Sequence, residues 1–116
     1  MNTKYKYALL LCCHNTPERH QMTNDIVLYY MNEIPINRIF IVDSANIGCN
    51  LIPKEQQCIF DQNIECRITT HITETEICSL LKASNTLDFG DAEYVLKLTC
   101  KYKLPELKSL IFTNDI

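Results

Sequence analysis

Two short apolar runs separated by one amphipathic helix constrain the fold of this chain more than any other feature. Residues 6–13 (KYALLLCC) and 38–42 (RIFIV) lack helical periodicity, which is typical of strands buried on both faces of a parallel sheet. The segment between them carries one apolar stripe at helical spacing, formed by Met22, Ile26, Tyr29 and Tyr30. A strand–helix–strand unit with so short a crossover predicts a parallel pair of strands in an α/β sheet.

The start and the end of this helix also have sequence signals. Asn15 or Thr16 is expected to cap the helix, and Pro17 suits its first turn. Glu18 favours the positive end of the helix dipole. Pro35 ends the helix because proline cannot continue it.

The remainder of the chain continues the α/β pattern. We expect strands over residues 57–61 and 94–99, and an edge strand or extended link over 65–72. We expect a helix over 75–83 with Ile77, Leu80 and Leu81 on its buried face, a loop over 85–91, and a last short helix over 104–112. The predicted fold is a three-layer, Rossmann-like α/β domain over residues 1–116, with a mostly parallel sheet.

Composition excludes several classes of protein. With 116 residues, 47% of them hydrophobic, the chain can form one globular domain with a real core. With a net charge of -3 the chain lacks the excess of positive charge that binds the phosphate backbone, so we expect no nucleic-acid partner. The apolar runs are too short to span a membrane and no signal peptide is evident, so a soluble, cytoplasmic protein is expected. Two glycines cannot build a G-x-G-x-x-G motif or a P-loop, which excludes dinucleotide Rossmann enzymes and P-loop NTPases.

Seven cysteines are many for a chain of this length. None forms a C-x-x-C motif, and the absence of an export signal argues against a disulfide framework. We expect small buried side chains and a few exposed thiols. Two alternatives remain open: a metal site built from Cys13, His14 and distant partners, and a cysteine nucleophile at Cys13 or Cys100 paired with His14 or His71.

Polar residues follow three of the predicted strands. They are His14, Asn15 and Thr16, then Asp43, Ser44 and Asn46, then Thr99, Cys100 and Lys101. In parallel α/β sheets ligands bind beyond the carboxyl ends of the strands, so these residues are the candidate binding site. Asp43 could instead accept hydrogen bonds from the amides that follow it, and Asn15 could act only as a helix cap.

The same positions carry a resemblance to a known family. The pattern LLLCCHNTPERHQMTNDIVLYY…IFIVDSAN is similar to the opening of nucleotide-sugar-dependent glycosyltransferases of the GT-A fold. The stretch AEYVLKLTCKYKLP resembles a subset in which a Lys-Leu-Thr-Gly-Arg/Lys-Tyr strand stands where metal-dependent relatives have Asp-x-Asp. The likeness spans residues 7–105, and it implies the nucleotide-binding, N-terminal half of a truncated GT-A domain.

The resemblance implies a role for seven residues. His14 and Asn15 would lie beside the donor nucleotide, Asp43 with Ser44 would contact the base or ribose, and Thr99, Cys100 and Lys101 would take the diphosphate position. The expected ligand is a UDP- or GDP-sugar. Without an Asp-x-Asp pair we expect no metal cofactor and hexosyl or related transfer, with Lys101 offsetting the charge of the leaving group. Cys100 departs from the subset, which usually has glycine there.

The resemblance does not extend to the segment that usually supplies the acceptor site and the catalytic base. The chain is therefore expected to bind a donor without completing the transfer, or to act as one part of a split enzyme. A partner chain or a second copy would then complete the sheet. The alternative function is a non-catalytic α/β interaction module that docks through an unpaired edge strand.

Overall fold

Four parallel strands form the centre of the molecule, whose structure is a computed structural model that describes residues 6–65, 72–105 and 107. The strands are β1 (Tyr7–Cys13), β2 (Ile39–Asp43), β3 (Gln57–Ile59) and β4 (Tyr94–Thr99), in the spatial order β3-β2-β1-β4. All three pairings are parallel. The predicted α/β class and the parallel pairing of the first two strands are confirmed.

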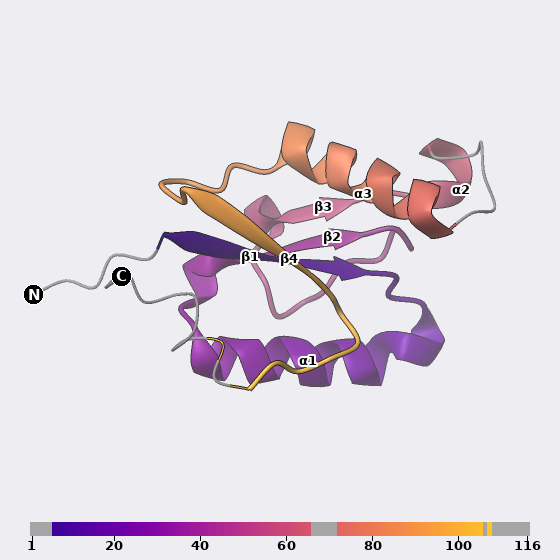
Figure 1. The fold of residues 1–116 in the computed structure, drawn as a ribbon. Helices are drawn as coiled ribbons and strands as arrows, with labels where there is room; N and C mark the ends of the chain where they lie inside the picture. The colour runs from indigo at the N-terminus through magenta and orange to yellow at the C-terminus, as the bar shows by residue number, and fades with distance from the viewer. Residues whose placement is uncertain (1–5, 66–71, 106, 108–116) are drawn as a thin grey trace, which may run out of the picture.

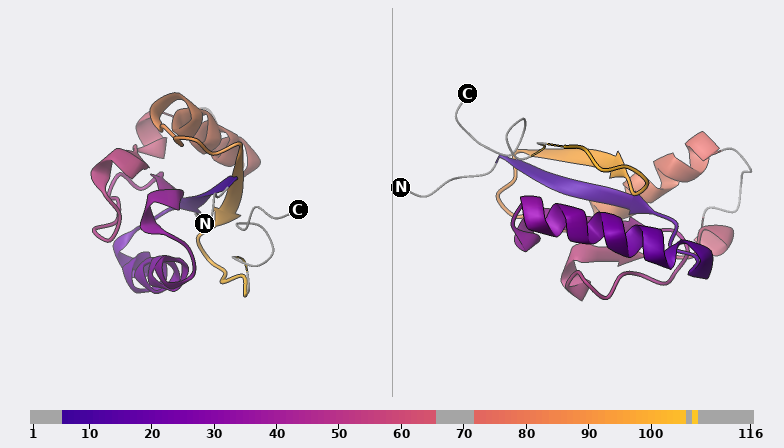
Figure 2. Two further views of the ribbon diagram at one scale, coloured as in Figure 1. Left: turned by 90° about the vertical axis from the view of Figure 1, so that its left-hand side faces the viewer. Right: turned by 90° about the horizontal axis from the view of Figure 1, so that it is seen from below.

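Helices cover both faces of this sheet. A 3-10 turn, η1 (Pro17–Arg19), leads into α1 (His20–Glu33), which lies on one face, and α3 (Ile72–Thr86) lies on the other (Figures 1 and 2). The short elements η2 (Ile36–Arg38), η3 (Lys54–Gln56) and α2 (Gln62–Glu65) connect the strands. Among the described residues, no helix has the length and apolar character needed to cross a membrane.

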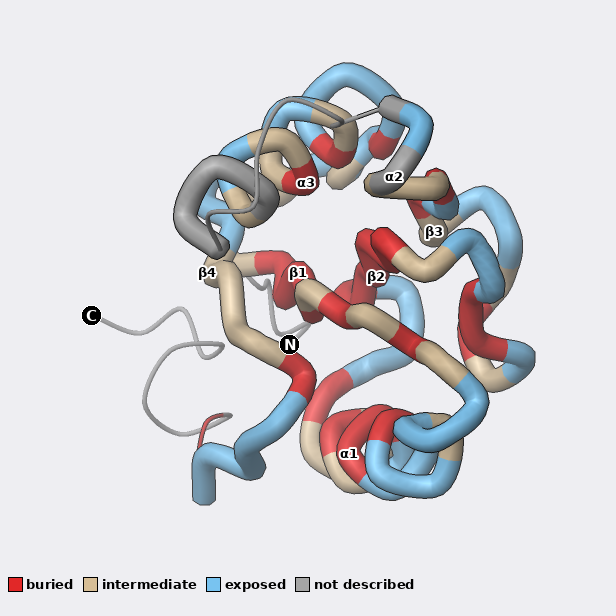
Figure 3. The backbone as a smooth tube through the Cα atoms, turned by 90° about the vertical axis from the view of Figure 1, so that its right-hand side faces the viewer, coloured by how far each residue is buried: buried red, intermediate tan, exposed pale blue. Residues whose placement is uncertain are grey.

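The core has two halves, one on each face of the sheet. Leu9 and Leu11 of β1 pack toward α1, whereas Ala8 and Leu10 pack toward α3. Because β1 lies between β2 and β4 and is covered on both faces, its apolar residues do not alternate with polar ones. In Figure 3 buried segments lie along β1 and β2 and on the side of α1 that faces the sheet.

Two local predictions differ from the structure, and a third lies mostly outside the described residues. Residue 65 ends α2 and residue 72 begins α3, so the expected strand or link over 65–72 is wrong at both ends, and residues 66–71 lie outside the described part. Thr16 precedes η1 without a side-chain capping bond. The expected last helix falls mostly outside the described residues, although Leu107 is buried on the α1 side.

The buried face of α3 is also different from the predicted one. Ile77 and Leu81 are 51% and 59% exposed, whereas Ser79, Ala83 and the following Leu87 are buried. Small residues such as Ser79 and Ala83 let α3 lie close to the sheet. Which α3 residues are buried therefore depends on how closely the helix packs on the sheet, and not only on the size of their side chains. Glu76 on the same helix forms an ion pair with Lys97 of β4.

The chain that leaves β4 crosses to the α1 face and is attached there by two tyrosines (Figure 1). The fully buried hydroxyl group of Tyr30 donates to the carbonyl of Tyr102 at 3.0 Å and accepts from the amide of Leu104 at 2.9 Å. Tyr29 donates to the carbonyl of Leu104 at 3.0 Å in a more exposed position. These bonds hold Tyr102 and Leu104 beside α1.

Removing the Tyr30 hydroxyl is expected to destabilise the protein. Tyr30→Phe leaves a donor and an acceptor without their partner and should lower the free energy of unfolding by about 1–3 kcal/mol. Tyr29→Phe is the matched control, and its loss should stay below about 1 kcal/mol because water can replace the exposed bond. Urea denaturation measures both values, and equal losses would contradict the role given to Tyr30.

Candidate functional site

Asp43, the last residue of β2, is the centre of the polar cluster at the carboxyl edge of the sheet. Its side chain is fully buried, and four backbone amides donate to it. Asn15 and Ala45 donate to Oδ1 at 2.8 and 3.1 Å. Ile47 and Gly48 donate to Oδ2 at 3.1 and 2.7 Å. The carboxylate therefore joins the loop after β1 to the loop after β2, and its oxygens are occupied by the protein itself.

The side chain of Asn15 reinforces this junction. Its Nδ2 donates to the carbonyl of Gly48 at 2.7 Å, and its Oδ1 accepts from Nδ1 of His20 at 2.9 Å. Asn15 is 2% exposed, so it is a buried connector rather than the helix cap that the sequence indicated. Through His20 the same network reaches the first residue of α1.

His14 and Ser44 form a second link between the two loops. Nδ1 of His14 lies 2.8 Å from the Ser44 hydroxyl, which donates to the carbonyl of Cys13 at 3.3 Å. Either group can supply the proton of the shorter bond, because the role of the ring nitrogen depends on the histidine tautomer. The half-buried His14 ring lies at this edge of the sheet.

The loop after β2 needs a glycine to bring its amides to Asp43. Gly48 has a φ of +83°. A Cβ added there would lie 2.6 Å from Cδ1 of Ile59 and 2.9 Å from Oε1 of Gln57. Gln57 in turn accepts from the amide of Cys49 at 2.9 Å, so this neighbour is itself held in place. The position therefore excludes any larger residue.

Substitution of this glycine tests whether the loop depends on it. Gly48→Ala should cost about 2–4 kcal/mol in the free energy of unfolding, because backbone strain and a steric clash add together. Gly90→Ala is the matched control, since Gly90 has a φ of +67° and no neighbouring atom within 4 Å. That variant should lose only about 1–2 kcal/mol. Denaturation curves in urea compare the two, and a Gly48→Ala loss no larger than the control would contradict this account.

The third cluster lies at the end of β4 and begins with its last residue, Thr99. Thr99 is half-buried, Cys100 is 3% exposed and packs in the α1-side core, and Lys101 is exposed. The amide of Cys100 donates to the carbonyl of Cys12 at 3.0 Å, which continues the β1–β4 ladder one residue beyond β4. Lys101 is therefore the first residue after β4 that turns away from the sheet.

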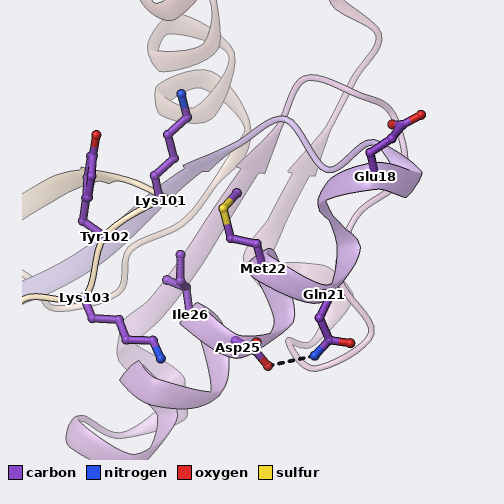
Figure 4. A pocket seen from close by; sticks show the side chains of 8 residues that line it. All are labelled: Glu18, Gln21, Met22, Asp25, Ile26, Lys101, Tyr102 and Lys103. Carbon is purple, nitrogen blue, oxygen red and sulfur yellow. Dashed lines mark hydrogen bonds between the residues drawn. The ribbon is translucent and has the colours of Figure 1, made fainter.

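An open groove of about 670 Å³ lies between this segment and α1 (Figure 4). One wall comes from η1 and α1 and the other from residues after β4; the lining residues are Glu18, Gln21, Met22, Asp25, Ile26, Lys101, Tyr102 and Lys103. Met22 and Ile26 point from α1 into the space between the walls (Figure 4). Lys103 extends alongside α1, whereas Lys101 extends away from the helix (Figure 4).

The two walls of the groove carry opposite charges. Lys101 and Lys103 lie on the wall after β4, while Glu18 and Asp25 lie on the α1 wall. Hydrogen bonds from its own backbone amide and from the Thr16 hydroxyl lower the pKa of Glu18, so this carboxyl group is ionised at neutral pH. The groove can thus offer cations to an anionic group and carboxylate acceptors to hydroxyl groups.

The structure separates the seven residues of the expected site into two groups. Asn15 with Asp43 and His14 with Ser44 form two hydrogen-bonded links between the loops after β1 and β2, and Asn15, Asp43 and Ser44 are buried. Residues 99–101 lie at the end of the neighbouring strand β4, and only Lys101 of these also lines the groove. The sequence predicted the strand ends but not the α1 wall, because Gln21 and Asp25 look like solvent-facing residues and Met22 was expected on the apolar stripe. In the structure Met22 is 37% exposed and lines the groove.

The cysteines are mostly small core residues, as expected. Of the described ones, Cys13, Cys49, Cys58 and Cys100 are buried thiols and Cys12 is a half-buried thiol. Cys78 is disulfide-bonded, which corrects the expectation of thiols alone. Pairing depends on proximity in space, so the spacing gave no signal for it. Cys66 and His71 lie outside the described residues.

No metal site is found in the part of the chain that the structure describes, where no three His, Cys, Asp or Glu side chains converge. Cys13 packs in the α1-side core, whereas His14 turns to Ser44. The two neighbours named for a metal or nucleophile site therefore face different surroundings.

The thiol of Cys12 should react slowly with alkylating agents. Burial raises its pKa to about 11, although the charge of Lys97 opposes part of this rise. Because the thiolate is the reactive form, labelling by iodoacetamide should accelerate about tenfold per pH unit from about pH 8 to pH 10. Mass spectrometry of the labelled peptide of a Cys13→Ser variant measures the rate, with glutathione as a reference. A plateau below pH 9 would contradict the raised pKa.

The groove lies where the order of the strands reverses. From β1 the chain continues to β2 and β3 on one side, whereas β4 lies on the other side of β1. The groove is lined by residues that follow β1 and by residues that follow β4. No protein-family model, curated protein or solved structure matches this chain, so the site is interpreted from its own geometry.

Proposed function

We propose that this chain binds a nucleotide sugar in the groove between α1 and residues 101–103. The observation that carries the proposal is the position of the groove, at the carboxyl ends of β1 and β4 where the strand order reverses. In open α/β sheets this switch point is the preferred site for ligands. The Rossmann-like, GT-A-like character suggested by the sequence belongs to the same proposal.

The lining of the groove supports a ligand that is both phosphorylated and rich in hydroxyl groups. Lys101 and Lys103 provide positive charge for a diphosphate. Glu18 and Asp25 provide acceptors for sugar or ribose hydroxyls, and Gln21, which donates to Asp25 at 3.0 Å, orients that carboxylate. A UDP- or GDP-sugar combines these groups in one molecule.

The residues of the Asp43 network have a supporting role in this proposal. Asp43 and Asn15 position the loop after β1, and with it the start of α1, rather than contacting the ligand. His14 offers Nε2 and Thr99 its hydroxyl at the strand ends, within the same edge of the sheet. Lys101 supplies positive charge beside the leaving diphosphate, so the proposed binding does not require a divalent cation. Glycosyl transfer would need an acceptor site beyond the groove.

One observation favours the alternative, a protein-interaction module. Within the described residues β4 pairs only with β1, and its first residues, Tyr94 and Val95, are 56% and 42% exposed. An edge strand with exposed apolar side chains can dock another chain. A molecular mass that rises with concentration, measured by analytical ultracentrifugation, would favour this alternative over a monomeric binding domain.

A ligand screen with one matched pair of variants tests the proposed function. The protein is titrated with UDP, GDP, CMP and their sugars, with and without manganese, by thermal shift and calorimetry. At a concentration 100 times the Kd, a ligand adds about 2.7 kcal/mol, which raises the Tm by several degrees. Lys101→Met should weaken binding by about tenfold to a hundredfold through the lost phosphate contact.

The matched control for this test is Lys54→Met. This variant removes an exposed lysine from η3, which does not line the groove, and should leave the nucleotide affinity unchanged. Stabilisation by one nucleotide regardless of manganese supports the proposal. No stabilisation by any nucleotide at millimolar concentration, or equal losses in both variants, would overturn it.

A further inference from the structure

Two buried thiols stand side by side at the carboxyl ends of β1 and β4. Cys12 pairs with Thr99 in the parallel register, and the amide of Cys100 donates to the carbonyl of Cys12. This bond places Cys100 opposite Cys13, because an amide in a parallel ladder bonds to the residue before its partner. Both side chains pack in the α1-side core, with 7% and 3% exposure.

The two thiols also influence each other's ionisation. The neighbouring Cys13 thiol lowers the pKa of Cys100, whereas the neighbouring Cys100 thiol and burial raise the pKa of Cys13. The Cys13 thiol itself donates to the carbonyl of Leu11 at 3.8 Å. Such an arrangement favours Cys100 as the attacking thiolate and Cys13 as the thiol that resolves the product.

We propose that Cys13 and Cys100 form a reversible disulfide that ties β4 to β1 and regulates the groove beside them. Paired strands lie about 4.8 Å apart, which is within reach of a disulfide whose Cα atoms are usually about 4.4–6.8 Å apart. Cβ atoms in a disulfide lie closer together, at about 3.8 Å, so the end of β4 must move toward β1 when the bond forms. A strained bond of this kind is easily reduced.

A small peroxide is an oxidant that can reach these buried thiols. The Cys100 thiolate attacks one oxygen of hydrogen peroxide, which breaks the O–O bond, gives a sulfenic acid and releases hydroxide. The Cys13 sulfur then attacks the Cys100 sulfur, and the sulfenic hydroxyl leaves with the Cys13 proton as water. In sum, two thiols and one peroxide give one disulfide and two waters. A dithiol reductant reverses the bond by thiol–disulfide exchange.

The position of Cys100 connects this bond to the groove. Lys101 follows it directly, and residues 101–103 form one wall of the groove. The far end of the same segment is fixed to α1 by Tyr30. Movement of Cys100 toward Cys13 therefore changes the position of Lys101 relative to Glu18 on the opposite wall. The regulatory part of the inference rests on the proposed function, whereas the disulfide itself does not.

Peptide mapping tests the disulfide without any ligand. The reduced protein is treated with one equivalent of hydrogen peroxide, alkylated and digested with trypsin under non-reducing conditions. We expect a cross-linked product of peptides 7–19 and 98–101, whose mass equals the sum of the two peptides with Cys12 alkylated, less two hydrogen atoms. The product should disappear after treatment with dithiothreitol. Cys78 lies in a different tryptic peptide and does not interfere.

Single variants assign the bond. Cys12→Ser should keep the cross-link, because Cys12 pairs with Thr99 and points to the opposite face of β1. Cys13→Ser and Cys100→Ser should abolish it. If those two variants fail to fold, the cross-link in Cys12→Ser alone identifies Cys13. Absence of the cross-link in the wild-type protein, or its loss in Cys12→Ser, would overturn the proposal.

A second measurement, independent of the peptide mapping, tests whether the disulfide changes the affinity of the groove for its ligand. Calorimetry with the nucleotide identified by the screen compares the peroxide-treated and reduced proteins. We expect the Kd to change at least threefold and to return after reduction, while Cys100→Ala shows no response to peroxide. An unchanged Kd despite a confirmed cross-link would overturn the regulatory part. Failure of every nucleotide to bind would contradict the proposed function and leave the disulfide result standing.

Discussion

The buried carboxylate of Asp43 is the interaction on which the carboxyl edge of the sheet depends. Burying a charged group in a protein core is costly unless it is fully hydrogen-bonded, and four amides donate to this one. Hydrogen bonds to a charged group each contribute about 1.5–3 kcal/mol, so the network offsets the desolvation cost. Because its donors come from the loops after β1 and β2, one side chain fixes where α1 begins and where the loop containing Gly48 turns back.

This interaction divides the edge of the sheet into a closed part and an open part. At the end of β2 the polar groups bond to one another, and Asn15, Asp43 and Ser44 are buried. Beside the ends of β1 and β4 the groove remains open, with residues after β4 forming its second wall. The division explains why the binding proposal centres on Lys101 and the α1 wall. The Cys13–Cys100 pair lies at the ends of β1 and β4, next to the wall that begins at Lys101.

The sequence predicted the features that depend on local pattern. Residues 6–13 and 38–42 were recognised as buried strands because burial on both faces leaves an uninterrupted apolar run. Residues 94–99 were predicted with their observed bounds. The buried face of α3 could not be predicted, since it depends on how closely Ser79 and Ala83 approach the sheet. Whether Asp43 would bind a ligand or its own loop was also undecidable, because both interpretations require the same residue after the same strand.

A titration followed by two-dimensional amide NMR tests the central claim most directly, which is that a ligand binds in the groove and not at Asp43. We expect UDP or another bound nucleotide to shift the amide signals of residues 101–103 and 18–26. The amides of Ala45, Ile47 and Gly48, which donate to Asp43, should keep their positions. Large shifts of these three amides without shifts at residues 101–103 would contradict this binding site. They would mean that the Asp43 carboxylate loses the hydrogen bonds from its own loop and binds the ligand instead.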